Sequence, residues 1–341
     1  MMVVNKWDGG ATIRRMNAEF DLIRRYFSRP VAGTLLSGGD DCALLPPPEQ
    51  QALAVTCDTL VAGTHFLPDD APADVGWKTL AASVSDIAAM AARPRWATLA
   101  LTLPEVRHDW LAAFAEGFYA CADAYDVALV GGDTTRGPLA ATVTLIGEVP
   151  QKRAVRRGGA RAGDELWVSG QPGRAALGLQ CAQGALELPF DARAQCLAAL
   201  RRPQPRLALG RLLAVRATAM LDVSDGLLAD LGHLLRASRL GAQLWQDALP
   251  LAALQQMGVS QAQAMQAVLA GGDDYELLFA APASLHEEVR QAGKTLSLPL
   301  HCIGRCEAGE TVRLRDGEGR EMALEGFAGF EHFPAAAQEP T

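Results

Sequence analysis

The order of apolar and polar positions along the chain predicts strands and helices mixed throughout its length. Short apolar runs or period-two alternation, typical of strands, occupy residues 53–57, 127–130, 139–149, 165–169, 220–223 and 275–280. Apolar side chains recur at helical spacing over residues 19–27, 77–92, 112–124, 173–183, 207–215, 227–235 and 262–269. Because both halves contain both kinds of element, we expect an α+β (mixed α/β) fold.

A basic, glycine-rich segment near the middle of the chain marks the expected boundary between two domains. Residues 151–163 read QKRAVRRGGARAG, which is typical of a linker. We therefore predict an N-terminal domain over residues 16–150 and a C-terminal domain over residues 151–334. The length of 341 residues agrees with two domains. The residues before Met16 follow no period, so a frayed tail and a start at Met16 both remain open.

Composition and charge indicate an ordinary globular protein and argue against several other classes of protein. Hydrophobic residues make up 49% and charged residues 21%, as in ordinary globular proteins. The net charge of −8 argues against a nucleic-acid partner. No uncharged apolar run approaches the roughly 20 residues of a membrane span, and the first ten residues lack the apolar core of a signal peptide.

The seven cysteines are widely spaced and odd in number, which favours reduced thiols and a cytoplasmic location. His301, Cys302 and Cys306 are close enough in sequence to suggest a metal clip. A zinc site needs more ligands than this segment supplies.

Aspartates that follow predicted strands and glycine pairs are the most informative polar feature. They are Asp40 and Asp41 after Gly38-Gly39, Asp58 at a strand end, Asp133 after Gly131-Gly132, Asp222 and Asp225 at the end of a strand and the start of a helix, and Asp273 and Asp274 after Gly271-Gly272. Loops at strand ends commonly carry ligand-binding groups. A single Gly-Gly-Asp can equally be a turn with a capping aspartate, but several in one chain favour a site.

Asp86 lies within the predicted helix 77–92, whose other side chains, apart from Lys78, are almost all apolar or small. A helix that is apolar nearly all round is buried on more than one side, and a buried carboxylate must be paired or bind a metal. A salt bridge to a basic residue and a metal ligand are the two alternatives for Asp86.

Carboxylate oxygens without clustered histidine or cysteine suit Mg²⁺, Mn²⁺ or Ca²⁺. Mg²⁺ commonly binds through a few carboxylates together with substrate phosphates, which indicates phosphoryl chemistry as a class. The sequence has no GxxxxGK[ST], GxGxxG or DFG motif. The residues alone therefore predict an acid-rich, Mg²⁺-dependent enzyme acting on phosphates.

The same segments resemble the thiamine-monophosphate kinase family, within the aminoimidazole-ribonucleotide synthetase superfamily. The resemblance covers nearly the whole chain, from Met16 to about Phe333, and its first matching string begins at Glu19-Phe20. They are Gly39-Asp40-Asp41, Asp58 to Phe66, Trp77-Lys78 with Ser85-Asp86, Gly131 to Thr135, Asp222 to Leu227, and Gly271 to Leu277. The order and spacing of these strings are far more specific than any one of them.

The resemblance implies two α+β domains per chain and a homodimer joined through the N-terminal domains. It implies the phosphorylation of thiamine monophosphate to thiamine diphosphate by ATP, the last step of thiamine diphosphate synthesis, with several Mg²⁺ ions. The implied Mg²⁺ ligands are Asp41, Thr56, Asp58, Asp86, Asp133, Asp222 and Asp225. The implied ATP contacts are Gly132, Asp133, Arg157 and Ser224, and the implied substrate contacts are His65, Asp273 and Phe330.

No general base is expected, because the acceptor phosphate has a second pKa of about 6 and is already mostly dianionic at neutral pH. In-line transfer would then depend on the Mg²⁺ ligands Asp41, Asp58, Asp86 and Asp133.

This chain departs from the family pattern in three places. Ser37-Gly38-Gly39 replaces Gly-x-Gly, Asp273 replaces a glutamate, and Phe330 replaces a tyrosine or tryptophan. Two alternatives are kept: another ATP-using member of the superfamily with a different acceptor, and a metal-binding protein without catalysis.

Overall fold

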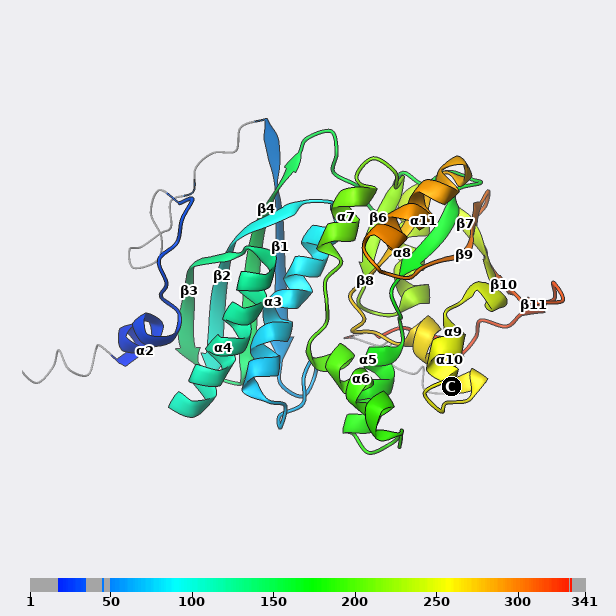
Figure 1. The fold of residues 1–341 in the computed structure, drawn as a ribbon. Helices are drawn as coiled ribbons and strands as arrows, with labels where there is room; N and C mark the ends of the chain where they lie inside the picture. Colours follow the sequence, from blue (N-terminus) through cyan, green and yellow to red (C-terminus); the bar gives the residue numbers. More distant parts are fainter. Residues whose placement is uncertain (1–17, 35–44, 46–49, 331, 333–341) are drawn as a thin grey trace, which may run out of the picture. The chain divides into compact units, whose positions relative to one another are not determined.

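The computed structural model describes residues 18–34, 45, 50–330 and 332 (Figure 1). The predicted Mg²⁺ ligand Asp41 and its neighbour Asp40 lie outside these residues. The helices are α2 (Ala18–Tyr26), α3 (Pro72–Ala89), α4 (His108–Tyr125), α5 (Arg174–Ala182), α6 (Phe190–Arg201), α7 (Leu207–Leu213), α8 (Leu227–Ser238), α9 (Leu251–Gln255), α10 (Gln261–Ala270) and α11 (His286–Thr295). Two short 3₁₀ turns are η1 (Gln246–Ala248) and η2 (Ala283–Leu285).

The strands form two sheets. They are β1 (Gln51–Val61), β2 (Arg93–Leu103), β3 (Ala128–Arg136), β4 (Ala140–Pro150), β5 (Glu165–Ser169), β6 (Ala219–Val223), β7 (Gly241–Trp245), β8 (Glu276–Ala281), β9 (Leu300–Glu307), β10 (Val312–Arg315) and β11 (Glu321–Met322). The first sheet has the order β1-β4-β2-β3 and the second the order β11-β10-β7-β9-β5-β8-β6.

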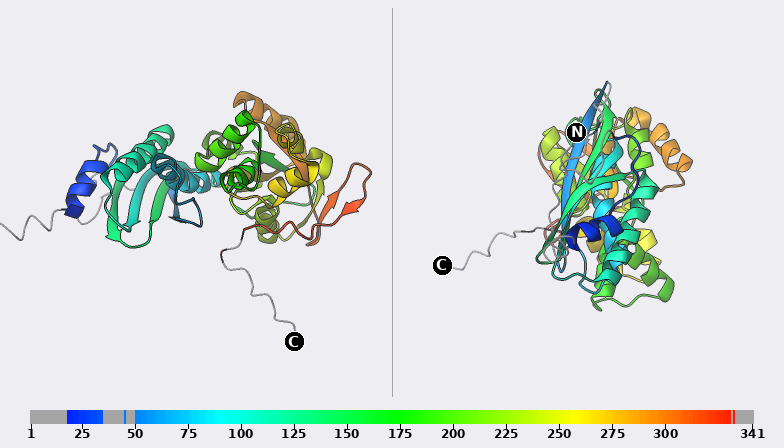
Figure 2. Two further views of the ribbon diagram at one scale, coloured as in Figure 1. Left: turned by 90° about the horizontal axis from the view of Figure 1, so that it is seen from below. Right: turned by 90° about the vertical axis from the view of Figure 1, so that its left-hand side faces the viewer.

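The four-stranded sheet is covered on one face. Along β4 the odd-numbered residues from Ala141 to Val149 are buried, and those between them are half-buried. Strict alternation of this kind is expected of a sheet with one covered face. Strands β2 and β3 run parallel, and their register shifts between Ala97 and Thr98. Figure 2 shows α4 lying across one face of these two strands.

Aromatic side chains give α4 its buried face. Phe114 and Phe118 are fully buried, as is Cys121, which confirms the predicted apolar face of this helix. The two phenyl rings stack with their centroids 6.3 Å apart. Phe27, directly after α2, packs edge-on against Phe114, and the Tyr26 hydroxyl lies 3.0 Å from Nδ1 of His108.

The central strands of the seven-stranded sheet send alternate side chains into two different cores. Along β5, Leu166 and Val168 belong to one core and Trp167 to the other. Along β8, Leu278 and Ala280 alternate in the same way with their neighbours. Because both faces are buried, these strands are continuous apolar runs in the sequence.

Different helices cover the two faces. Helices α5, α6, α8, α9 and α10 contribute to the core that contains Leu166. The core that contains Trp167 receives α7, α11 and the last residues of α3, with Ala88 and Leu209 buried in it. The β10–β11 strands form one edge of the sheet (Figure 2).

Packing groups the chain into two compact units. Of the described residues, the N-terminal unit contains residues 18–34 and 45, Cys57–Thr79 and Trp96–Thr144, and the C-terminal unit contains Leu80–Arg95 and the chain from Leu145 onward. Residues 50–56 also belong to the C-terminal unit. The predicted division at residue 150 stays a prediction. Among the described residues, no helix has the length and apolar character needed to cross a membrane.

All the strands and helices predicted above have counterparts in the structure, but two aspartates are placed differently from the expectation. Asp58 was expected at a strand end, whereas β1 continues to Val61. Asp133 was expected in a loop after a glycine pair, whereas β3 continues through Gly131 and Gly132 to Arg136. Both strands continue because ladder pairing to neighbouring strands overrides the local turn preference of glycine and aspartate.

Candidate active site

Three segments that are distant in sequence meet in the C-terminal unit through main-chain hydrogen bonds. The amide of Asp273 donates to the carbonyl of Ser224 at 2.8 Å, and the amide of Tyr275 donates to the carbonyl of Val223 at 2.8 Å. The amide of Phe330 donates to the carbonyl of Asp225 at 2.9 Å. The predicted site residues Asp222, Ser224, Asp225, Asp273 and Phe330 are thereby brought together.

The end of β6 and the loop that follows it carry two of the predicted metal ligands. Asp222 is the buried, second-to-last residue of β6, and Asp225 is half-buried just before α8. The loop is held by Asp230, whose Oδ2 accepts the amides of Ser224, Asp225 and Gly226 at 3.1 to 3.2 Å. Asp230 therefore satisfies amides at the start of α8, which would otherwise lack partners.

Asp230 is an unusual carboxylate. Burial raises its pKa to about 7, the neighbouring Asp225 adds to this rise, and the three amide donors oppose it. A buried carboxylate beside a second carboxylate is costly to ionise, so this corner of the site favours a bound cation or a proton.

The Gly-Gly-Asp-Asp segment lies directly against the β6–α8 loop. A Cβ on Gly272 would be 2.5 Å from the carbonyl oxygen of Ser224, so this close approach requires glycine. Asp273 and Tyr275 have φ values of 64° and 52°, and the Tyr275 hydroxyl donates to Oδ1 of Asp273 at 3.2 Å. Strained backbone of this kind is typical of functional loops.

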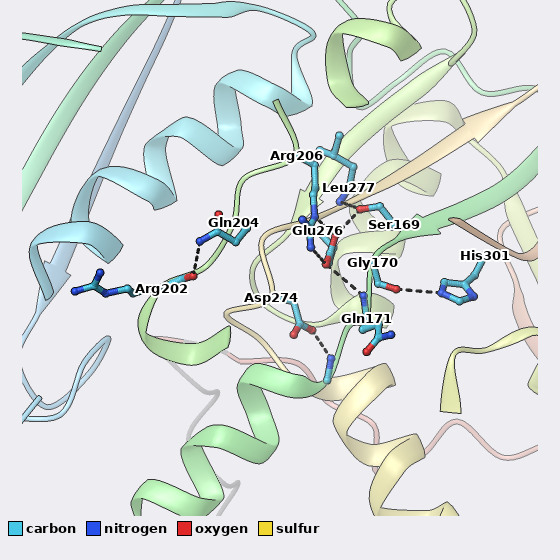
Figure 3. A network of polar contacts seen from close by, with 11 residues as sticks. Ser169, Gly170, Gln171, Arg202, Gln204, Arg206, Asp274, Glu276, Leu277 and His301 are labelled. Carbon is cyan, nitrogen blue, oxygen red and sulfur yellow. Dashed lines mark hydrogen bonds and ion pairs between the residues drawn. The ribbon is translucent and has the colours of Figure 1, made fainter. Parts of the chain in front are cut away.

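The end of this segment is anchored by a buried polar network (Figure 3). Glu276 accepts from Arg206 at both carboxylate oxygens, at 2.5 and 2.6 Å, and from the hydroxyl of Ser169 at 2.6 Å. Asp274 accepts the amide of Gly173, the residue before α5, at 2.8 Å. Burial raises the pKa of Asp274 well above its usual range. Asp274 and Glu276 therefore fix the loop, and Asp273 lies at its tip.

Arg157 lies near the same loop, although it was predicted from a linker-like segment. Burial lowers the pKa of His233 on α8, and the positive charges of Arg236 and Arg157 lower it further. The negative charge of Asp225 opposes this change. The exposed Arg157 and the half-buried Asp225 thus act on one imidazole. The carbonyl of Arg156 accepts the amide of Met220, which ties this segment to β6.

Thr56 and Asp86 form a second group. The Thr56 hydroxyl on β1 donates to Oδ2 of Asp86 on α3. Asp86 is half-buried rather than fully buried, whereas its neighbours Ser85 and Ile87 are buried. Of the two alternatives for Asp86, this contact is compatible with an oxygen-lined metal site.

The other described site residues belong to the N-terminal unit. Half-buried Asp58 is on β1, and Asp133 is exposed on β3, an edge strand of the sheet. A Cβ on Gly132 would lie 1.9 Å from the Leu99 carbonyl oxygen, so glycine is required beside Asp133. Nδ1 of His65 accepts the Val61 amide at 3.0 Å, which leaves the proton of a neutral ring on Nε2.

Sequence reasoning missed the residues that hold the site. Asp230 was seen only as part of an apolar helix, and Glu276 only as the end of a motif. The sequence does contain a signal for Asp230 and Glu276, because each is a charged residue in or beside an almost wholly apolar segment. A buried charge in such a segment needs a partner, which distant residues such as Arg206 provide.

Comparison with known proteins gives the class to which this chain belongs. The family model described as AIR synthase related protein, N-terminal domain, matches residues 39–149, and the corresponding C-terminal domain matches residues 161–317. The fold and the site thus define an AIR-synthase-related protein, as the sequence predicted.

Individual relatives give the family within this class. The chain is 44% identical to the thiamine-monophosphate kinase of Salmonella typhimurium over 92% of this chain and 98% of that protein. The thiamine-monophosphate kinase structure from Stenotrophomonas maltophilia K279a is 46% identical, with a TM-score of 0.81 over 89% of this chain and 98% of that one. AaThiL complexed with AMPPCP and TMP is 29% identical, with a TM-score of 0.72 over 94% and 98% of the two chains. The chain belongs to the thiamine-monophosphate kinase family.

The Arg206–Glu276 ion pair gives a test of the anchoring network. The Glu276 side chain is 5% exposed and that of Arg206 is 26% exposed. We expect Arg206→Gln to lower the free energy of unfolding by about 3 kcal/mol, because it leaves a buried carboxylate without its cation. Denaturant unfolding measures this change.

The exposed pair between Arg107 and Asp109 on the protein surface is the matched control. Arg107→Gln should leave the unfolding midpoint unchanged. Equal, small effects of the two substitutions would contradict the anchoring role of Glu276.

The raised pKa of Asp230 predicts a pH dependence of stability. Between about pH 4 and pH 7 the folded chain holds a proton that the unfolded chain has released, so this contribution to stability is lost as the pH rises. We expect the free energy of unfolding of the wild type, minus that of Asp230→Asn, to fall across this range in Mg²⁺-free buffer.

Asp316 is a control of the opposite sign. Hydrogen bonds from Arg320 lower the pKa of Asp316. The difference between wild type and Asp316→Asn should therefore rise or stay level as the pH increases. A difference for Asp230 that rises with pH would show that its ionised form is the favoured one in the folded chain.

Proposed function

We propose that this protein transfers the γ-phosphoryl group of ATP to thiamine monophosphate, forming thiamine diphosphate and ADP. The observation that carries the proposal is the convergence of Asp222 to Asp225, Asp273 and Phe330 in a chain of the thiamine-monophosphate kinase family. The AaThiL structure, with its ATP analogue and TMP, supports the same pair of substrates.

The described residues fit a requirement for Mg²⁺. The donor set consists of carboxylate and hydroxyl oxygens, which are the ligands this cation prefers. Burial of Asp222 and the effect of Asp225 on the pKa of Asp230 indicate a site with excess negative charge. We propose Thr56, Asp58, Asp86, Asp133, Asp222 and Asp225 as ligands, together with Asp41.

Bound Mg²⁺ would neutralise the phosphates and so allow two polyanions to approach. The residues of the chain then position the substrates. Ser224 and Arg157 lie near the β6–α8 loop and would bind ATP, as would Gly132 and Asp133, where glycine lets a ligand approach the backbone. Arg157 suits a phosphate because its guanidinium can donate two parallel hydrogen bonds.

The acceptor substrate would lie beside the Gly-Gly-Asp-Asp loop. Asp273, held by Tyr275 and by the Ser224 carbonyl, places a negative charge where a cationic thiazolium ring could bind. Phe330, which is 48% exposed, offers a ring for stacking. We also propose His65 as a substrate contact. The acceptor phosphate attacks directly, so no residue needs to remove a proton.

The assay that tests this proposal measures ADP release with ATP, Mg²⁺ and thiamine monophosphate, and identifies thiamine diphosphate as the product. Thiamine and buffer without acceptor are the substrate controls. We expect Asp225→Asn to reduce kcat by about a hundredfold, because several kcal/mol of charge stabilisation are lost.

Asp191→Asn, which changes an exposed aspartate in the first turn of α6, is the matched control and should retain full activity. ADP release with Mg²⁺-ATP but only with a different phosphate acceptor would overturn the substrate assignment. Full activity of Asp225→Asn would overturn its role as a metal ligand.

We further propose a homodimer and a cytoplasmic location. Strand β1 is an edge strand with two exposed apolar side chains, Leu53 at 48% and Val55 at 62% exposure. Exposed apolar edges are usually covered, and we propose that a second copy covers this one, within the predicted N-terminal domain of residues 16–150. Free thiols at all the described cysteines support a reducing compartment.

Val55→Asp tests the dimer. We expect sedimentation or light scattering to give twice the chain mass for the wild type and the single chain mass for Val55→Asp, because a charge would be buried in the interface. Val215→Asp, at an equally exposed valine outside β1, should leave the mass doubled. A wild type of single chain mass would contradict the dimer.

A further inference from the structure

Three potential metal ligands meet at the end of β5 that lies away from the candidate active site. Glu165 is the first residue of β5, Cys302 lies on the adjacent strand β9, and His286 is the first residue of α11. One ligand atom from each lies within 4.8 Å of the other two. In the ion pair, Nδ1 of His286 is 2.9 Å from Oε2 of Glu165.

We propose that Glu165, His286 and Cys302 form a binding site for a divalent cation of the zinc class. An imidazole nitrogen, a thiolate sulfur and a carboxylate oxygen are together the ligand types of Zn²⁺, whereas Mg²⁺ and Ca²⁺ avoid sulfur. With the thiolate and the carboxylate both ionised, their charge of −2 balances a divalent cation.

The scaffold holds these residues close to a metal-binding arrangement. Glu165 and Cys302 lie on paired strands of the seven-stranded sheet. The His286 ring is positioned against Trp167, with ring centroids 4.9 Å apart. In tetrahedral zinc sites, ligand atoms about 2.0 to 2.3 Å from the metal lie roughly 3 to 4 Å from each other, so only small side-chain movements are needed.

The site is also accessible. The His286 side chain is 42% exposed and that of Glu165 is 18% exposed. Three protein ligands leave the fourth tetrahedral position to water, which the exposed side of His286 can supply. A cation can therefore enter without unfolding of the strands.

The position along the sheet separates this site from the proposed Mg²⁺ ligands. Glu165 pairs with Ala281, the last residue of β8, whereas the candidate site lies at Glu276, where β8 begins. Five residue steps of strand correspond to about 17 Å. The inference therefore does not depend on the proposed kinase reaction, and the two can fail independently.

A role for Cys302 as a nucleophile is less consistent with its surroundings. Burial raises the pKa of its thiol to about 11, and Glu165 adds to this rise. Reactive cysteines instead have lowered pKa values. The sequence-based clip with Cys306 is also disfavoured, because Cys306 is buried in the opposite core, on the far side of the sheet.

Cobalt titration of the metal-stripped full chain tests the proposal. We expect one equivalent of Co²⁺ to produce a thiolate-to-cobalt charge-transfer absorption, together with the visible bands of a tetrahedral ion. Zn²⁺ should abolish both signals, and excess Mg²⁺ should not, since Mg²⁺ does not compete for a thiolate. Zn²⁺ should also raise Tm.

The variants identify the ligands. Cys302→Ser should lose the thiolate band, and Glu165→Gln and His286→Gln should weaken Co²⁺ binding by at least about tenfold. Two control variants, His301→Gln and Cys57→Ser, should retain the band. Nε2 of His301 lies 3.0 Å from the Gly170 carbonyl oxygen rather than in the cluster. Cys57 is an exposed cysteine next to the proposed Mg²⁺ ligands.

Circular dichroism establishes that each variant is folded. If Cys302→Ser does not fold, Glu165→Gln decides the question, because it retains the size of the side chain and a hydrogen-bond acceptor for His286. The absence of a thiolate band in the wild type, its persistence in Cys302→Ser, or wild-type affinity in Glu165→Gln would overturn the proposal. The cluster would then be only a hydrogen-bonded His286–Glu165 pair.

Discussion

Main-chain pairing between the β6–α8 loop and two later segments is the interaction on which the candidate site depends. The amides of Asp273, Tyr275 and Phe330 all donate to carbonyls between Val223 and Asp225. The backbone makes these bonds, and the Tyr275 hydroxyl adds a hydrogen bond to the carboxylate of Asp273. Gly272 is required in this arrangement, since any side chain there would push the two loops apart.

The acids of this region divide into those that hold the backbone and those that we propose as ligand-binding residues. Asp230 and Asp274 accept hydrogen bonds from backbone amides. Glu276 accepts hydrogen bonds from Arg206 and Ser169. These three carboxylates therefore stabilise the fold. Asp225 and Asp273 lie on the loops so anchored. Anchoring has an electrostatic consequence, because burial raises the pKa of Asp230 and the nearby carboxylate of Asp225 adds to this rise. A bound cation would offset the charge of these carboxylates, which is consistent with the proposed Mg²⁺ ligands.

The sequence predicted the α+β fold class, the strands with clear periodicity and the acids of the C-terminal site. Local patterns failed where long-range pairing decides the structure. Strand β2 begins with Arg-Pro-Arg and was not predicted, because its stability comes from the partner strand β3. Helix α6 was not predicted either, because only Ala192, Cys196 and Leu200 are buried along it, where it contacts α5. Asp58 and Asp133 were placed at strand ends for the same reason: the ladder continues past residues that alone would favour a turn.

Residues that act together across the sheet leave no local pattern at all. Glu165, His286 and Cys302 are separated by more than a hundred positions at the widest, and only the β5–β9 pairing and the start of α11 bring them together. Glu276 and Arg206 show the same effect at the other end of the sheet. The seven-stranded sheet thus has a separate polar cluster near each end of its central strands, on either side of a fully apolar middle. Since apolar packing of Leu166, Val168 and Phe279 stabilises that middle, we expect substitutions in one polar cluster to leave the other undisturbed.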